Sequence, residues 1–196
     1  MKKLATLGST IFFFSATLAY ATSINFEQFT DSELLTNQVP GLTFSNTTVL
    51  TAGISLNELE FPPHSGQNVA SDNGGPIRIT FATPIFSFSG FFTYTTTITL
   101  TGLSATNNVL ASTASQYSAN YIGSGVAGAS PNEFLQISST SGVSQIDILG
   151  DPAGGSFVMD DITFTSATPE PATLILGAGG TALLVLRSKR FPKIPS

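Results

Sequence analysis

Carboxylates are the most numerous groups in this sequence that could do chemistry. The chain has twelve Asp and Glu residues, nearly all of them between positions 22 and 168. Two carboxylates at a suitable separation can hydrolyse a glycosidic bond. Glu58 and Glu60 are spaced to share one face of a strand, and Asp147 and Asp151 form a looser pair. An extracellular hydrolase is therefore one hypothesis, although the absence of Trp argues against a sugar-cleaving cleft.

His64 is the only imidazole, and Ser65 follows it directly in the stretch "PPHSG". A Ser-His-Asp hydrolase would have to use this histidine. No G-x-S-x-G element accompanies it, and adjacent loop residues are poorly arranged as nucleophile and base. We therefore expect His64 to be a surface-loop residue. No catalytic residue is predicted, and the favoured hypothesis is a protein without enzymatic activity.

Composition excludes several classes of function. The chain has no Cys, which rules out disulfides, thiol nucleophiles and thiolate metal sites. Between residues 22 and 168, Arg78 is the single Lys or Arg among many acids. Because phosphate backbones are bound through Lys and Arg, we do not expect nucleic acid to be a partner.

The first residues of the chain have the pattern of a leader that precedes the folded domain. Two lysines at positions 2 and 3 come before an apolar stretch over residues 4–18, and Ala19-Tyr20-Ala21 follows. This order is typical of a secretory signal peptide with an A-x-A cleavage site at Ala19 and Ala21. We expect signal peptidase to remove residues 1–21, so that the mature chain begins at Thr22 outside the cytoplasm.

The other end of the chain has the pattern of a membrane segment. Residues 172–186 are apolar or small, and as a helix they would span about 22 Å of the ~30 Å hydrocarbon core. The basic residues Arg187, Lys189 and Arg190 follow and can extend the span by snorkelling. We expect a single membrane helix over residues 172–186 with its C-terminus in the cytoplasm.

Pro169, Glu170 and Pro171 stand directly before this apolar run. The triplet, the apolar run and the basic cluster, in this order over residues 168–190, resemble the PEP-CTERM sorting signal of exported proteins of Gram-negative bacteria. The resemblance implies a precursor tethered in the inner membrane, processing by an exosortase at or near the triplet, and a mature form at the cell surface or outside the cell. The terminal "FPKIPS" departs from the abrupt end of such signals and leaves the motif intact.

The body between the two signals, residues 22–167, has the pattern of an all-β domain. Short stretches rich in Thr, Val, Ile and Phe alternate with clusters of Gly, Pro, Asn and Ser, as in a β-sandwich or barrel. Period-2 alternation predicts a set of core residues: Ile77, Ile79, Phe81, Phe86, Phe88, Ile98, Leu100, Ile146, Ile148, Ile162 and Phe164. No stretch of the body shows helical periodicity.

Two segments are predicted to be long loops, residues 61–76 and 121–133, because both are rich in turn-forming residues. Binding sites tend to lie on such loops. Tyr94, Tyr117 and Tyr121 are candidate platforms for a sugar ring, and the last two lie beside the second loop. The sequence therefore names Tyr117 and Tyr121 as candidate ligand-binding residues.

The body has a resemblance of its own. The stretches "INFEQF", "PIRITFATPIFSFSGFF" and "FVMDDITF" are similar to jelly-roll domains of the carbohydrate-binding-module kind and to lectin-like bodies of other PEP-CTERM proteins. The resemblance implies a jelly-roll-like β-sandwich in which Glu27 and Asp160 or Asp161 hold a structural calcium ion. Calcium prefers several hard oxygen ligands, but no D-x-D-x-D-G loop is present, and an ordinary acidic turn is the alternative.

Two leading hypotheses remain from the sequence. The first is a non-enzymatic exported protein that is sorted to the envelope or extracellular matrix through its PEP-CTERM tail, with signal peptidase and exosortase as its processing partners. The second is a carbohydrate-binding module that presents its loops to extracellular polysaccharide.

Overall fold

The protein was analysed as a computed structural model, which describes residues 19–167. The predicted leader up to residue 18, the Pro-Glu-Pro triplet, the membrane helix over 172–186 and the basic cluster lie outside the described residues. Within residues 19–167 there is no helix long and apolar enough to cross a membrane. These residues form one compact unit.

The described chain is built from strands, and every strand pair is antiparallel. In chain order the strands are β1 (Ala19–Ile24), β2 (Leu34–Leu35), β3 (Leu42–Ser45), β4 (Thr47–Thr51), β5 (Asn68–Asp72), β6 (Ile77–Tyr94), β7 (Thr99–Leu103), β8 (Val109–Ala114), β9 (Glu133–Leu149) and β10 (Phe157–Ala167). The prediction of an all-β domain is confirmed.

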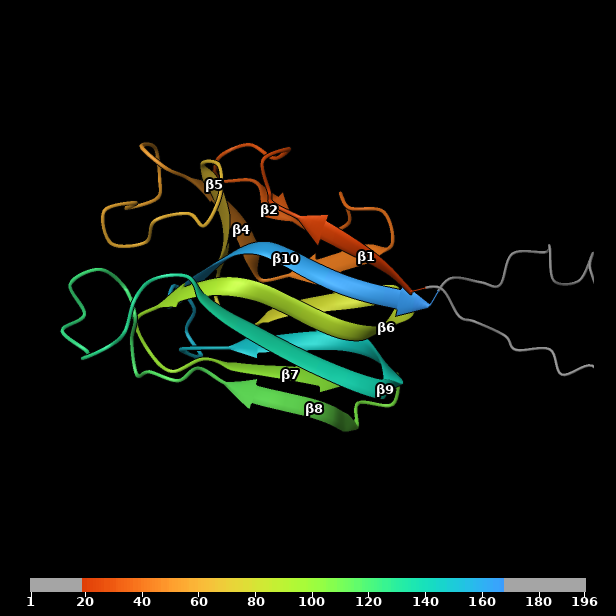
Figure 1. Cartoon of the computed structure of the whole chain (residues 1–196). Coiled ribbons are helices and arrows are strands. Elements are labelled where there is room, and N and C mark those ends of the chain that lie inside the picture. The colour runs from red at the N-terminus through yellow and green to blue at the C-terminus, as the bar shows by residue number, and fades with distance from the viewer. Residues whose placement is uncertain (1–18, 168–196) are drawn as a thin grey trace, which may run out of the picture. The chain divides into compact units, whose positions relative to one another are not determined.

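Two long strands, β6 and β9, fold this sheet into a sandwich (Figure 1). The first part of β6 pairs with β3 and with the end of β9. The end of β9 also pairs with β7, and β7 pairs with β8. The second part of β6 pairs with β10 and with the start of β9. β10 in turn pairs with β1 and β5. Register shifts in β6 between Thr80 and Ser87 mark the place where the strand passes from one layer to the other.

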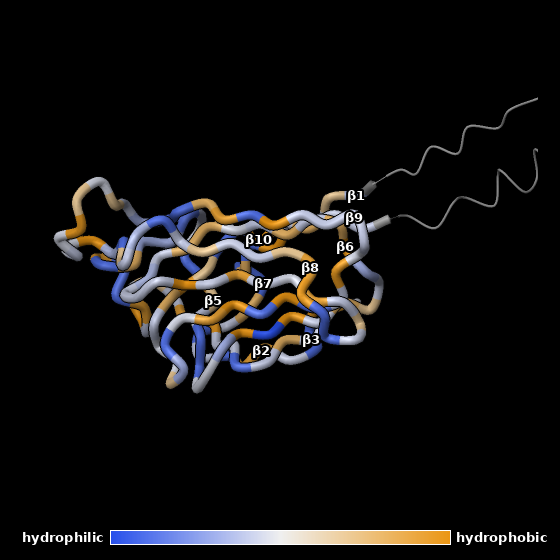
Figure 2. Tube along the Cα trace, turned by 90° about the horizontal axis from the view of Figure 1, so that it is seen from below, coloured by the Kyte–Doolittle hydropathy of each residue, from blue (hydrophilic) through white to orange (hydrophobic). Residues whose placement is uncertain are grey.

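The core lies between the two layers, and hydrophobic and hydrophilic residues alternate along the strands (Figure 2). All but one of the core residues predicted by period-2 alternation are buried. The exception is Phe86, which is 36% exposed. The prediction was wrong there because the register shift between Ile85 and Ser87 breaks the alternation, so that Ile85 and Phe88 face the core in its place.

The prediction of a continuous loop over residues 61–76 was also wrong. Asn68–Asp72 is the buried strand β5, paired with β4 and β10. Its polar side chains satisfy their hydrogen bonds inside the protein: Asn68 donates to the carbonyls of Phe26 and Phe29, and Ser71 donates to that of Phe157. Burial of this strand therefore does not depend on an apolar pattern. The two longest irregular connections are residues 52–67 and 115–132.

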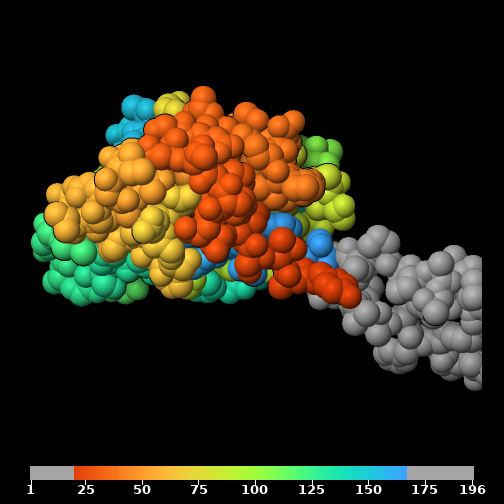
Figure 3. Space-filling model, turned by 90° about the horizontal axis from the view of Figure 1, so that it is seen from above, coloured from red at the N-terminus to blue at the C-terminus, as the bar shows by residue number. Residues whose placement is uncertain are grey.

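The chain enters and leaves the described domain at one end of the sandwich. Ala19 pairs with Ala167 across β1 and β10, whereas the two long connections lie at the opposite end (Figure 1). Residues 19–76, coloured red to yellow, cover most of the face seen in Figure 3. The surface near the loops is thus the part of the domain farthest from the paired ends.

Candidate functional site

Four strands present an open face of polar side chains on the outside of the sandwich. The register of β1, β10, β6 and β9 places Ser23, Thr163, Ser89 and Gln136 side by side in one row. The next row contains Thr165, Ser87 and Ser138. Their neighbours along each strand, such as Phe88 and Phe164, point into the core. We call the outward side chains of these two rows the open face.

Hydrogen bonds between hydroxyls order the open face. The hydroxyls of Ser23 and Thr163 lie 2.8 Å apart, and those of Ser87 and Thr165 lie 2.6 Å apart. A hydroxyl has one donor and two acceptor positions, so each of these groups keeps capacity for a further partner. The exposed amide of Gln136 adds both a donor and an acceptor. The open face can therefore hydrogen-bond a ligand that is itself rich in hydroxyls.

Three rings stand in a row at the loop end of the open face. Phe91 pairs with Phe134 across β6 and β9, and their ring centroids are 5.3 Å apart. His64 stacks on Phe91 with a centroid separation of 3.5 Å and an angle of 8° between the rings. Phe134 is 52% exposed. We call His64, Phe91 and Phe134 the ring row, and it gives the open face an apolar edge.

A β-bulge in β10 holds the connection 52–67 against this face. The bulge lies between Asp160 and Thr163, and Asp161 has a φ of 46°, in the left-handed region. Both carboxylates turn towards the connection as a result: Asp161 accepts from Nδ1 of His64 at 2.6 Å and from Oγ of Ser65 at 2.9 Å. Asp160 accepts from the Ser65 amide at 2.8 Å. The bulge thereby fixes His64 in the ring row.

Asp160 is the most deeply buried acid of this cluster, with 1% of its surface exposed. Burial raises the pKa of Asp160 to about 6, against the lowering effect of the hydrogen bonds from the Ser65 and Asp161 amides. The carboxyl group therefore takes up a proton in mildly acidic solution.

Glu27 holds the same connection from its other side. Its carboxylate accepts from the amides of Gln67 and Asn68 at 2.9 and 2.8 Å. Gly66 has a φ of 58°, and a Cβ at this position would collide with the Glu27 carboxylate. Only glycine combines this backbone conformation with such a close approach.

These contacts bear on the predicted calcium site. Glu27, Asp160 and Asp161 all bind the segment 64–68, as described above, but no group of three or more His, Asp and Glu side chains in the part of the chain described here is placed to hold a metal ion. Their oxygens accept hydrogen bonds from amides, a hydroxyl and an imidazole instead. Calcium on these three residues therefore stays a prediction that only experiment tests.

The two long connections meet at Tyr121, one of the candidate tyrosines. Tyr121 stacks on Phe61 at 5.8 Å, so one side of its ring is already covered. Tyr117 is half-buried against the core. Tyr94 is fully buried, with its hydroxyl on Glu133, and cannot be a platform. Tyr117 and Tyr121 therefore stabilise the connection 115–132, and the structure offers Phe134 as the more open ring.

Three of the four carboxylates considered for hydrolysis are engaged elsewhere, and the fourth, Glu60, is exposed on the connection 52–67. Asp147 forms a two-pronged salt bridge with Arg78, with both N–O distances at 3.0 Å. Asp151 accepts from the Ala153 amide in a turn. Glu58 accepts from its own amide and from the Gly53 amide, and these hydrogen bonds lower the pKa of Glu58. None of these contacts resembles an acid and base facing a common substrate.

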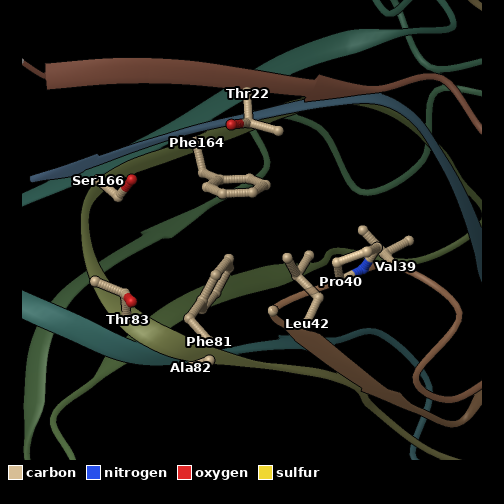
Figure 4. Close-up of a pocket in the computed structure, with 10 residues that line it drawn as sticks. Thr22, Val39, Pro40, Leu42, Phe81, Ala82, Thr83, Phe164 and Ser166 are labelled. Carbon is tan, nitrogen blue, oxygen red and sulfur yellow. The ribbon is translucent and has the colours of Figure 1, made fainter. Parts of the chain in front are cut away.

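A small cavity of about 180 Å³ opens between β1–β10 and β3–β6 (Figure 4). Val39, Pro40 and Leu42 line one side, and the rings of Phe81 and Phe164 meet edge to face at 5.2 Å. Thr22, at which the mature chain is predicted to begin, also lines it. The cavity is mostly apolar and has few groups that could select a ligand.

Sequence reasoning missed the ring row and the open face, although part of the signal was present. In "EFLQIS" Phe134, Gln136 and Ser138 alternate with the buried Leu135 and Ile137. This alternation would have placed Phe134 on the outer surface of a strand. Nothing local in the sequence indicated that His64 would lie on Phe91.

Comparisons with known proteins identify no family for this chain. No family model matches the sequence, and no curated protein matches it. Among solved structures, the K2 cleaved adhesin domain of Lys-gingipain is similar with 15% identity over 74% of this chain and 99% of that one, at a TM-score of 0.49.

Two further structures illustrate the range of similar folds. A family 29 carbohydrate-binding module shares 11% identity over 80% of this chain and 98% of its own, at a TM-score of 0.40. An arabinose-bound α-L-arabinofuranosidase shares 16% identity over 76% of this chain and 28% of its own, at a TM-score of 0.43. With TM-scores below 0.5, these likenesses assign no activity to the chain.

Proposed function

We propose that the protein is an exported, non-enzymatic carbohydrate-binding domain with a jelly-roll-like β-sandwich fold, and that its open face binds a neutral polysaccharide. The observation that carries this proposal is the position of the half-exposed Phe134 beside the polar rows of β10, β6 and β9. The C–H face of a sugar packs on an aromatic ring, while its hydroxyls need donors and acceptors close by. The open face supplies both.

Charge favours an uncharged ligand. Arg78 is the single Lys or Arg of the described domain and is paired with Asp147, while most acids have no cationic partner. An anionic polysaccharide would meet like charge on this domain. We therefore propose that the ligand is a neutral glycan.

The predicted tail gives the proposal a location. The PEP-CTERM-like residues 168–190 would tether the precursor in the inner membrane until an exosortase acts on it. Because the described chain ends beside its start, the residue to which the tail is joined lies at the end of the domain opposite the long connections. A domain held in this way presents its binding face to material outside the cell.

Affinity electrophoresis of the 22–167 body through gels with neutral or acidic polysaccharides tests the proposal. We expect retardation by at least one neutral polysaccharide, and a Phe134→Ala variant should lose about tenfold or more in affinity. Leu149→Ala is the matched control, since Leu149 is 43% exposed on β9 in the other layer.

Loss of affinity in Tyr121→Ala, with the affinity of Phe134→Ala unchanged, would move the site to the loops. Indifference to every glycan would favour a matrix protein without a sugar ligand.

A further inference from the structure

Strand β8 is an uncovered edge of the sheet. It is the last strand of the path that runs through β6, β9 and β7, and it pairs with β7 alone (Figure 1). An edge strand presents unpaired N–H and C=O groups that can pair with another strand. The side chains of Val109, Ser112 and Ala114 are exposed along it.

Charge and proline, two features that normally block such an edge, are missing from β8; a register shift against β7 between Gly102 and Leu103 leaves residues 111–114 regularly paired. Its sequence, "VLASTA", contains no charge and no Pro. The other edges are better protected: β2 and β3 have only two and four residues, and short edges pair poorly. β1 would lose its first three residues to the predicted cleavage after Ala21. After that cleavage, β8 is the longest free edge in the described domain.

The stretch of sequence around β8 is uncharged although the domain is acidic, and Asp147, two strands away in the row of Ser112, is neutralised by its salt bridge with Arg78. No Asp, Glu, Lys or Arg occurs between Arg78 and Glu133, a stretch that contains β7, β8 and the connection 115–132. Two copies of this domain would repel each other wherever their acidic surfaces approach. The β8 edge is a place where they can meet without that repulsion.

We propose that β8 binds a second copy of this chain by antiparallel pairing with the β8 of that copy, which joins the two sheets into one. A two-fold axis at the middle of the strand would bring Val109 opposite Ala114 of the second copy. Val109 is 64% exposed in the single domain, and this pairing would cover it. The main-chain hydrogen bonds supply the attraction, as in other cases of strand addition.

The proposed contact between two β8 strands is small, and its small area limits its affinity. A six-residue strand buries less than the ~1,600 Å² of a standard stable interface. The pairing should therefore be weak and depend on concentration. Tethering many copies at one surface raises their local concentration and favours the paired form.

Sedimentation velocity of the 22–167 body, whose core lies wholly within residues 24–164, tests the proposal. From low micromolar to near-millimolar concentration the mean mass should rise towards twice that of one chain. Ser112→Glu and Ala114→Glu should each keep the protein monomeric, because a charge on an edge strand disfavours its pairing with another strand. Ser141→Glu adds the same charge at an exposed position of β9 and should leave the association unchanged.

Three results would overturn this proposal, two of them from the parent protein and the β8 variants. One is a monomer at every concentration. The other is association that survives both Ser112→Glu and Ala114→Glu in variants whose circular dichroism and melting match the parent protein. Association abolished equally by Ser141→Glu would also refute it, because the effect would then be general charge repulsion.

Discussion

His64 and Asp161 are 97 residues apart in the sequence, yet Nδ1 of the imidazole lies 2.6 Å from the carboxylate. The same imidazole lies flat on Phe91. One side chain therefore joins the connection 52–67, the bulge of β10 and the outer surface of β6. The stability of this connection and the shape of the ring row depend on the same contacts.

Replacement of His64 by Ala should loosen the connection 52–67. The variant loses the hydrogen bond to Asp161 and the stacking on Phe91, so the free energy of unfolding should fall by about 1–2 kcal/mol. Urea denaturation followed by circular dichroism measures this change. Leu59→Ala is the control, because Leu59 lies on the same connection and is 78% exposed. Equal stability of the two variants would show that the imidazole contacts contribute nothing measurable.

Protonation of Asp160 should make the domain relatively more stable in acid. Burial raises the pKa of Asp160 in the folded protein to about 6, above its ordinary value of 3.8. The stabilising contribution is then fully present below about pH 4 and is lost as the pH rises through about 6. Asp160→Asn removes this titration. The unfolding free energy of the parent minus that of the variant should therefore decrease as the pH rises from about 4 to about 6.

The pH measurement needs a control because other carboxylates titrate in the same range. Asp151→Asn replaces an exposed carboxylate in a turn and controls for the loss of one carboxylate outside the cluster around Asp160. A difference between parent and Asp160→Asn that stays constant or grows as the pH rises would contradict the raised pKa.

Gly66 and Gly125 form a natural comparison for the contact with Glu27. Both have a positive φ, 58° and 72°, but a Cβ would collide with the Glu27 carboxylate only at Gly66 and would meet nothing within 4 Å at Gly125. Gly125→Ala should cost the left-handed backbone strain alone, about 1 kcal/mol. Gly66→Ala should lower the melting temperature further, as differential scanning calorimetry can measure. Equal losses would mean that Glu27 moves aside freely.

Removal of calcium with a chelator tests the calcium site that the sequence predicts. Because the carboxylates of Glu27, Asp160 and Asp161 already accept protein hydrogen bonds, we expect the melting temperature of the body to be unchanged by EDTA. A fall in melting temperature that is reversed by calcium and absent in Asp160→Ala would instead assign a calcium site to these residues.

The sorting signal can be tested in the native host with the full chain. Intact mass should show a mature form that begins at Thr22 and ends near Pro169-Glu170-Pro171. Replacement of the triplet by three alanines should abolish this trimming and leave the protein in the membrane fraction. A chain that keeps Leu186 and Arg190 whether or not the triplet is mutated would be a membrane-anchored protein that no exosortase processes.

Local alternation was sufficient to predict most of this fold. Ile77, Ile79, Ile146 and Ile148 are buried as expected because a strand with one face in the core needs apolar residues at every second position. Alternation failed where hydrogen bonds or register decide burial. β5 is buried through satisfied polar groups, and Phe86 is turned outward by a shift of register.

The candidate site was harder to predict than the strands. Glu27, Asp160 and Asp161 were singled out as candidate calcium ligands, but their hydrogen-bond partners come from a connection distant in the sequence and were not foreseen. The role of Phe134 depends on which face of β9 points to solvent and on what covers its neighbours. Both are settled by the packing of the layers, which no single stretch of sequence contains.

The pairing of Ala19 with Ala167 gives this domain the geometry of an insert. A domain whose two ends lie on neighbouring strands can be placed within a surface loop of another protein without forcing that loop open. For the same reason a short linker between the ends would permit circular permutation, with new termini in the exposed connection around Gly125. The order of the strands along the chain can thus be changed while each strand keeps its neighbours in the sheet.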